Sequence, residues 1–172
     1  MAENKVLYAE QDGVVFIKMC GVIRYTTVLG FDVFVDRLAR RTDVTDLLVD
    51  LSEAEYLDST HLGLLAVLAG FIHKKGGFKA KIITNAPAVT ELIKDIGLDR
   101  VFVLITNTDT CTVEILQEIP SDEKTELDKA KMILSAHKAI MDLSEKNRTI
   151  FHNVVELLQN DVDRAEQQGL DL

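Results

Sequence analysis

The chain opens with short apolar runs followed by a stretch with helical spacing. Residues 6–9 and 14–20 are rich in β-branched and apolar side chains, and Asp12-Gly13 between them is a strong turn signal. We therefore expect a β-hairpin that Gly21 ends. Apolar residues that recur at helical spacing then predict a helix: Leu29, Val33, Phe34 and Leu38.

A strand-loop-helix junction forms the centre of the pattern. Residues 46–51 make a short apolar run typical of a buried strand. Residues 62–71 suit a helix that packs on a sheet, and this helix is too short to span a bilayer. Asp58, Ser59 and Thr60 lie between them and are residue types that cap helix starts. The junction is therefore either a simple cap or a hydroxyl displayed for modification, since phosphorylation there would add nearly two negative charges.

Strands and helices continue to alternate up to Pro120. The expected elements are a strand over residues 79–84, a helix from Pro87 to Gly97, a strand over 101–105, and a helix begun by Asp109 or Thr110 and closed by Pro120. Alternation of this kind predicts an α/β fold with a mixed sheet of four to five strands and helices packed on it.

The texture changes after residue 120, so we divide the chain into a domain over 1–120 and a helical extension over 121–172. No glycine or proline occurs from Ser121 until Gly169, and charges are interleaved with apolar residues. The heptad pattern weakens between Ser144 and Arg148. A turn there would make a helical hairpin, which we favour; otherwise a single helix would need a second chain to cover its apolar stripe. The extension could also serve only to stabilise the first domain.

Composition narrows the classes of function. The chain has 172 residues, of which 47% are hydrophobic, which suffices for one domain with a real core. Its net charge of −9 argues against binding nucleic acid or an anionic membrane surface. Two cysteines imply no disulfide framework, and the N-terminal residues carry no export signal, so we expect a cytoplasmic protein without membrane insertion.

The histidines give no sign of catalysis. They are dispersed, without the cysteine or acidic neighbours of a metal site or a nucleophile-base pair, at His61, His73, His137 and His152. A glycine-rich phosphate loop is also missing. We therefore assign no catalytic residue, metal or cofactor and expect no enzyme. His61 is interpreted as an exposed or partner-contacting side chain, and His137 as a packed or register-setting one.

The order of the motifs resembles the STAS family, named for sulfate transporters and anti-sigma factor antagonists. The similarity runs from Val6 to about Leu116 and rests on the strand Leu47-Leu48-Val49-Asp50-Leu51 followed by Tyr56-Leu57-Asp58-Ser59-Thr60-His61-Leu62-Gly63. Asn85-Ala86-Pro87-Ala88-Val89 and Gly97-Leu98-Asp99-Arg100-Val101-Phe102 resemble the family's third helix and return to the sheet. The family's usual glycine after the hydroxyl pair is His61 here.

This resemblance implies a function in protein binding. In the antagonist branch, the hydroxyl directly after the aspartate is phosphorylated by a serine kinase that doubles as the anti-sigma factor, and a PP2C-type phosphatase reverses the modification. Ser59 takes that position, with Thr60 as the alternative. We expect a docking patch at the junction and on exposed residues of its helix, formed by Asp58, Thr60, His61, Gly63, Leu64 and Leu68.

Two alternatives stay open. One is a STAS scaffold that is never phosphorylated and belongs to a larger signalling or transporter-associated complex. The other concerns the extension, which could join two copies of the chain in a homodimer through the C-terminal helices.

Overall fold

The computed structural model describes residues 3–26, 29–106, 116–120 and 124–169. The expected hairpin is present: β1 (Lys5–Gln11) pairs antiparallel with β2 (Val14–Ile23). Its turn has positive φ at both Asp12 (50°) and Gly13 (83°), as a tight hairpin turn requires. The prediction that Gly21 ends the second strand is wrong. Gly21 instead takes a φ of 74° at an irregularity in the register with β3, and β2 continues beyond it.

Within the described residues, six strands form one mixed sheet in the order β5-β4-β3-β2-β1-β6. The parallel part consists of β2, β3 (Asp46–Leu57), β4 (Lys81–Ile83) and β5 (Val103–Ile105). The α/β fold is confirmed, with more strands than the four to five expected because Gln117–Glu118 adds β6 beside β1. A helix that begins at Asp109 or Thr110 was predicted there, and most of its range, up to residue 115, lies outside the described residues.

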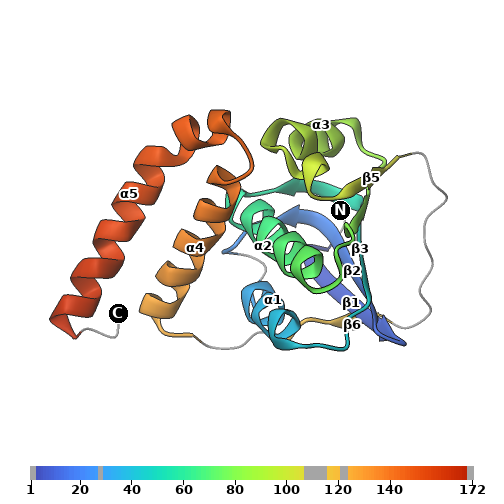
Figure 1. The fold of residues 1–172 in the computed structure, drawn as a ribbon, viewed down its shortest axis with the longest axis horizontal. Coiled ribbons are helices and arrows are strands. Elements are labelled where there is room, and N and C mark those ends of the chain that lie inside the picture. The colour runs from blue at the N-terminus through green and yellow to red at the C-terminus, as the bar shows by residue number, and fades with distance from the viewer. Residues whose placement is uncertain (1–2, 27–28, 107–115, 121–123, 170–172) are drawn as a thin grey trace.

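Helices cover one face of this sheet (Figure 1). α1 (Phe31–Arg40) and α2 (Ser59–Gly76) pack over its centre, and α3 (Pro87–Ile96) with the short 3-10 helix η1 (Leu98–Arg100) lies toward β5. Alternate residues of the central strands point toward these helices. They form a fully buried layer that includes Val15, Ile17, Met19, Leu47, Val49 and Leu51. The core therefore lies between the sheet and α1 and α2.

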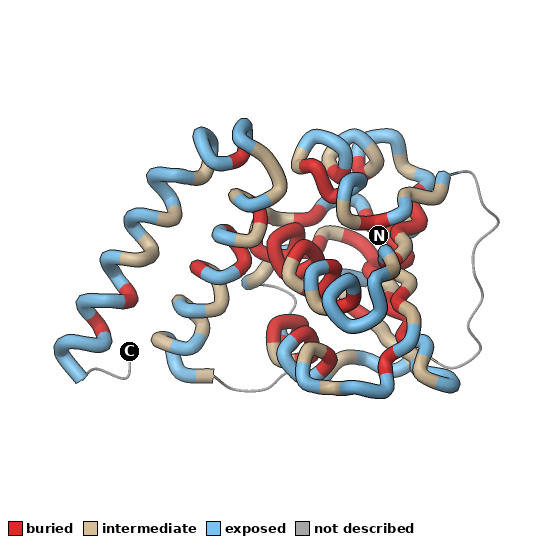
Figure 2. Tube along the Cα trace, in the orientation of Figure 1, coloured by how far each residue is buried: buried red, intermediate tan, exposed pale blue. Residues whose placement is uncertain are grey.

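The C-terminal extension folds into the helical hairpin favoured from the sequence. α4 (Glu126–Met141) and α5 (Glu145–Gln168) are separated by a short turn, and Ser144 caps α5 by accepting a hydrogen bond from the N–H of Asn147. α4 lies against α2, whereas α5 packs on α4 and forms the outer edge of the molecule (Figure 1). Figure 2 shows that most of α5 is exposed while much of α2 is buried.

Asn147 attaches the turn of the hairpin to the sheet domain. Its side chain is completely buried, and its amide nitrogen donates to the carbonyl oxygens of Ile96 (2.8 Å) and Ile140 (3.0 Å). Both carbonyls lie in the last turns of helices, α3 and α4, where helical partners run out. The carbonyl of Ile140 also accepts a hydrogen bond from the N–H of Leu143 at 3.1 Å. One amide group therefore joins the start of α5 to both of these helices.

We expect Asn147→Ala to lower the free energy of unfolding by about 1–3 kcal/mol, because the carbonyl of Ile96 loses its side-chain donor and that of Ile140 keeps only its backbone donor. Urea denaturation followed by circular dichroism measures this change. Asn153→Ala, on the exposed side of the same helix, serves as the matched control and should change the free energy by less than about 0.5 kcal/mol. Equal effects of the two substitutions would contradict the assigned role.

Candidate functional site

Asp58 fixes the geometry of the junction between β3 and α2. It is the N-cap residue of α2, and its Oδ1 accepts hydrogen bonds from the backbone N–H and the Nδ1 of His61, both at 2.9 Å. Its Oδ2 accepts from the backbone N–H of Tyr25 at 2.6 Å. The carboxylate therefore both starts the helix and attaches it to the segment that follows β2.

These hydrogen bonds also govern the ionisation of Asp58. Burial of the carboxyl group disfavours its charged form, but the bonds from the His61 side chain, the His61 N–H and the Tyr25 N–H outweigh that effect and lower the pKa of Asp58 below 3.8. Asp58 is thus a carboxylate at neutral pH. It places a fixed negative charge directly beside the hydroxyl of Ser59.

Ser59 is the first residue of α2, so the cap leaves its hydroxyl available. That hydroxyl lies 3.0 Å from Nε2 of His137, a residue of α4. The other ring nitrogen of His137, Nδ1, lies 2.8 Å from the carbonyl oxygen of Ile133 and must carry a proton to bond with it. In the neutral ring Nε2 is then an acceptor, and Ser59 donates to it. No pattern in the sequence indicated that a histidine of the extension reaches this serine.

A serine paired with a histidine is also part of the arrangement that hydrolases use to activate a nucleophile. In those enzymes the histidine is held on its far side by a carboxylate, which stabilises the charged ring. In this chain the carbonyl of Ile133, in the same helix, takes that place. A neutral carbonyl orients the ring without supplying that charge, which favours a structural contact over a catalytic pair.

His61 is buried, in contrast to the exposed side chain that we expected. Only 1% of it is accessible, and its ring stacks on Phe31 with centroids 5.7 Å apart and an interplanar angle of 11°. Its Nδ1 is held by Asp58. The physical reason is that the hydrogen bond to the cap turns the ring inward, against the first residue of α1. His61 thus stabilises the junction from within the core, through its contacts with Asp58 and Phe31.

The outer face of α2 is covered by α4. Gly63 makes this possible, because a Cβ atom at this position would lie 2.2 Å from the carbonyl oxygen of Ala136. The exposure that we expected for Leu64 and Leu68 is wrong: only 3% of Leu64 and none of Leu68 is accessible. Thr60, at 7%, is buried as well. Thr60 is next to Ser59, whereas Leu64 and Leu68 lie further along α2, and none of the three contributes to an open patch.

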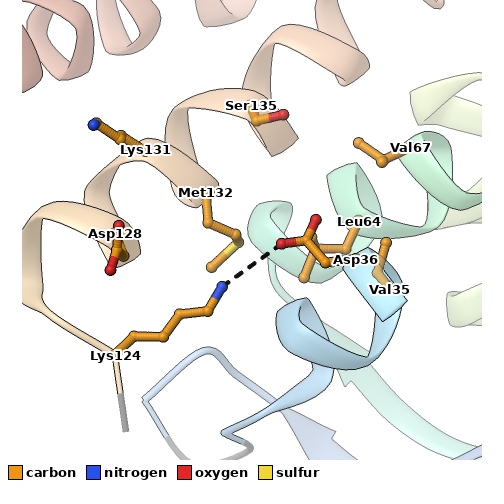
Figure 3. Close-up of a pocket in the computed structure, with 9 residues that line it drawn as sticks. All are labelled: Val35, Asp36, Leu64, Val67, Lys124, Asp128, Lys131, Met132 and Ser135. Carbon is orange, nitrogen blue, oxygen red and sulfur yellow. Dashed lines mark ion pairs between the residues drawn. The ribbon is translucent and has the colours of Figure 1, made fainter. Parts of the chain in front are cut away.

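The contact between the hairpin and the domain is looser toward the start of α4. A cavity of about 420 Å³ opens there between α1, α2 and α4 (Figure 3). Leu64, Val35 and Met132 form its apolar part, and Lys124 lies across from Asp36 at 4.0 Å. Lys124 also pairs with the buried Asp32 at 2.6 Å. The hairpin is thus packed tightly near Ser59 and held mainly by charge at its other end.

An exposed aromatic residue lies just ahead of the cap, within the junction motif but outside the docking patch that we expected. Tyr56, near the end of β3, is 44% exposed, and the guanidinium of Arg24 lies 5.4 Å from the centre of its ring. Tyrosine and arginine are the side chains most often found at energetically important positions of protein interfaces. The available signal was an isolated aromatic directly after Ser52-Glu53-Ala54-Glu55, a stretch without a large apolar side chain.

Two classes of feature are not seen in the part of the chain that the structure describes. No group of three or more histidine, cysteine, aspartate or glutamate side chains is placed to hold a metal ion. None of the described helices combines the length and the apolar character needed to cross a membrane.

We expect Gly63→Ala to loosen the hairpin, since α4 must move outward to admit the new methyl group, and to lower the free energy of unfolding by about 1–3 kcal/mol. Gly70→Ala on the same helix is the matched control: nothing lies within 4 Å of its added methyl group, so it should raise stability by about 0.5–1 kcal/mol. Urea denaturation and hydrogen exchange of α4 measure both. Stabilisation by both substitutions would refute the close contact.

Asp58→Asn tests the lowered pKa. Asparagine is also a good cap, so the substitution removes mainly the charge. A carboxyl group with a lowered folded-state pKa stabilises the fold above its unfolded pKa, and this contribution disappears as the pH falls through the folded-state pKa. The stability difference between wild type and variant should therefore shrink as the pH falls from about 5 to about 2. A difference in the free energy of unfolding that stays constant across that pH range would show that the charge has no role.

The comparisons with known proteins bear on this junction. Residues 5–112 match the family model of the STAS domain, which ends before the helical hairpin. Among solved structures, an anti-sigma factor antagonist from Mycobacterium paratuberculosis is 27% identical, with a TM-score of 0.51 over 63% of this chain and 87% of that one. None of the curated proteins matches in sequence.

Two structures of SpoIIAA are also similar. The unphosphorylated form of this anti-sigma factor antagonist is 14% identical, with a TM-score of 0.49 over 60% of this chain and 87% of that one. The phosphorylated form, described as a Bacillus cell fate determinant, gives the same identity and TM-score over 60% and 90%. The match to the STAS family model spans well over half of the present chain, from β1 onward. The chain therefore belongs to the STAS domain family.

Proposed function

We propose that this protein is a binding regulator of the anti-sigma factor antagonist type, switched by phosphorylation of Ser59. Its partner would be an anti-sigma factor that is also a serine kinase, with a PP2C-type phosphatase restoring the bare hydroxyl. The observation that carries the proposal is the Ser59 hydroxyl, which lies at the first residue of α2 and takes no part in capping. The similarity to the mycobacterial antagonist supports it. Since such a kinase uses ATP, the switch would operate in the cytoplasm.

Ser59 suits modification better than Thr60. Ser59 is only half-buried, whereas Thr60 is 7% exposed and would have to leave its packing to meet a kinase. A phosphate at the start of α2 would also be tolerated by the fold, because the free N–H groups and dipole of a helix N-terminus favour negative charge. The cost of the phosphate would fall on binding instead.

The partner would compete with the hairpin for the same face of α2. α4 covers Gly63 and Leu64, so a partner that binds this face of α2 must displace α4. Tyr56 and Arg24, which the hairpin leaves accessible on the side of β3, would supply the first contact. The other residues of the expected patch would act from beneath by holding the junction in shape: Asp58, Thr60, His61 and Leu68.

Phosphate at Ser59 would exclude both competitors. Only 3.0 Å separates the hydroxyl oxygen from Nε2 of His137, which leaves no space for a phosphoryl group. A partner would likewise have to bury the new charge beside the carboxylate of Asp58, which costs several kcal/mol when no cation compensates it. The phosphorylated protein would therefore bind neither α4 nor the partner in this position.

Phosphopeptide mass spectrometry on the protein from its native cells tests the modification directly. We expect phosphate at Ser59 in at least one growth state. Its consistent absence from both Ser59 and Thr60 would favour the other reading, an unphosphorylated STAS scaffold in a larger signalling or transporter-associated complex.

Affinity capture from the same cells tests the binding switch. Ser59→Ala should recover a partner with a kinase fold, and Ser59→Asp should recover at least about tenfold less of it, because the added charge must be desolvated. His137→Ala removes the bond that holds α4 over Ser59 and should increase recovery. His152→Ala, an exposed histidine of α5, is the matched control. Equal capture by the alanine and aspartate variants of Ser59 would refute the switch.

A further inference from the structure

α5 presents an exposed apolar stripe on a side of the helix that does not pack on α4. Three large aliphatic side chains on it are widely exposed: Ile150 at 55%, Val154 at 41% and Leu157 at 66%. Their spacing of four and three residues places them on one side of the helix. Figure 2 shows α5 at the outer edge of the molecule, mostly exposed along its length.

This apolar stripe is separate from the surface that holds α5 on α4. The buried residues of the second half of α5 are Val162 and Ala165, and Phe151 and Leu158 are half-buried on the same side. At 100° per residue, this packed side lies roughly 90° around the helix from the apolar stripe. The packing of the hairpin therefore does not account for the stripe, and its exposure costs free energy in water.

Opposite charges bound the two ends of the apolar stripe. Lys146 precedes Ile150 by four residues, Asp161 follows Leu157 by four, and both are exposed. All five positions fall within about 80° of one another around the helix. Asp161 has a weak contact within its own helix, 4.0 Å from Arg164, and both side chains are largely exposed. Between residues 146 and 161 this surface is therefore positive, then apolar, then negative; Arg164, one turn beyond Asp161, lies in the same sector.

We propose that this surface binds a second copy of the chain, with the two α5 helices antiparallel about a two-fold axis near Val154. In that register Ile150 of one copy lies opposite Leu157 of the other, and Lys146 lies opposite Asp161. Each contact occurs twice, as a two-fold interface requires. The order positive, apolar, negative is complementary to itself only when the second helix runs in the opposite direction.

Charge favours this occupant. The chain carries a net charge of −9, so two copies repel each other at long range, and a surface for self-association needs local compensation. The Lys146 and Asp161 pairs provide it at both ends of the apolar stripe. One helix face is small beside the roughly 800 Å² per partner of stable interfaces, so the dimer should dissociate in the micromolar range.

Analytical ultracentrifugation of the full chain, at about 0.15 M salt and across micromolar concentrations, tests the dimer. We expect a reversible monomer-dimer equilibrium. Leu157→Glu places a charge in the centre of the contact and should weaken the dimer by about a hundredfold or more. A chain that stays monomeric throughout, or a dimer that Leu157→Glu leaves unchanged, would overturn the proposal.

A charge exchange tests the antiparallel register. Lys146→Asp alone should weaken the dimer about tenfold, since it loses both ion pairs and creates two repulsive ones. Adding Asp161→Lys should restore the affinity. The matched control exchanges Arg148→Asp and Asp163→Lys, exposed positions on another side of α5, and should have no effect. Failure of the double exchange to restore the dimer would exclude this register.

A different occupant would give its own result. If the chain remains monomeric and Leu157→Glu instead abolishes cross-linking of α5 to another protein in native cells, the stripe belongs to that protein and the dimer is refuted.

Discussion

The approach of two helix backbones at Gly63 determines how the two parts of this chain are joined. The missing side chain lets the main chain of Ala136 come so close that any larger residue would have to push α4 outward. Once α4 lies at this depth, Leu64 is covered and His137 reaches the hydroxyl of Ser59. The state of the proposed switch therefore depends on a contact between backbones, which is sensitive to displacements far smaller than a side chain.

The two residues at the start of α2, Asp58 and Ser59, have different roles in the junction. The carboxylate of Asp58 accepts hydrogen bonds from the first turn of the helix and from Tyr25, and so keeps the local backbone in place. Ser59 makes no such contribution, and its hydroxyl is held only from outside, by His137. A chemical change at Ser59 can thus alter what docks on α2 without unfolding α2. This separation of fold from recognition is what a reversible modification requires.

Local patterns predicted most of the fold. The hairpin turn at Asp12-Gly13, the cap at Asp58 and the helix end at Gly97 follow from residues adjacent in sequence, and all three are present. The contact between Ser59 and His137 joins residues 78 positions apart, and no local pattern contains it. The same limit explains Leu64: its apolar face was recognisable, but the sequence could not tell that the chain's own extension covers it. Gln117–Glu118 became a strand because β1 offered an unpaired edge, which is again tertiary information.

If a partner displaced the hairpin from α2, as we propose, the hairpin would remain covalently attached, because the chain between β6 and α4 joins it to the sheet domain. A tethered segment of this kind competes at an effective concentration on the order of millimolar, however dilute the protein itself is. A free ligand meets that competition at every encounter, so its apparent affinity is reduced by the fraction of time for which the tethered helix occupies the face. Because α4 is attached, a ligand must bind the face of α2 tightly enough to compete with it. A weak, adventitious ligand would not displace α4, whereas a cognate partner would have to.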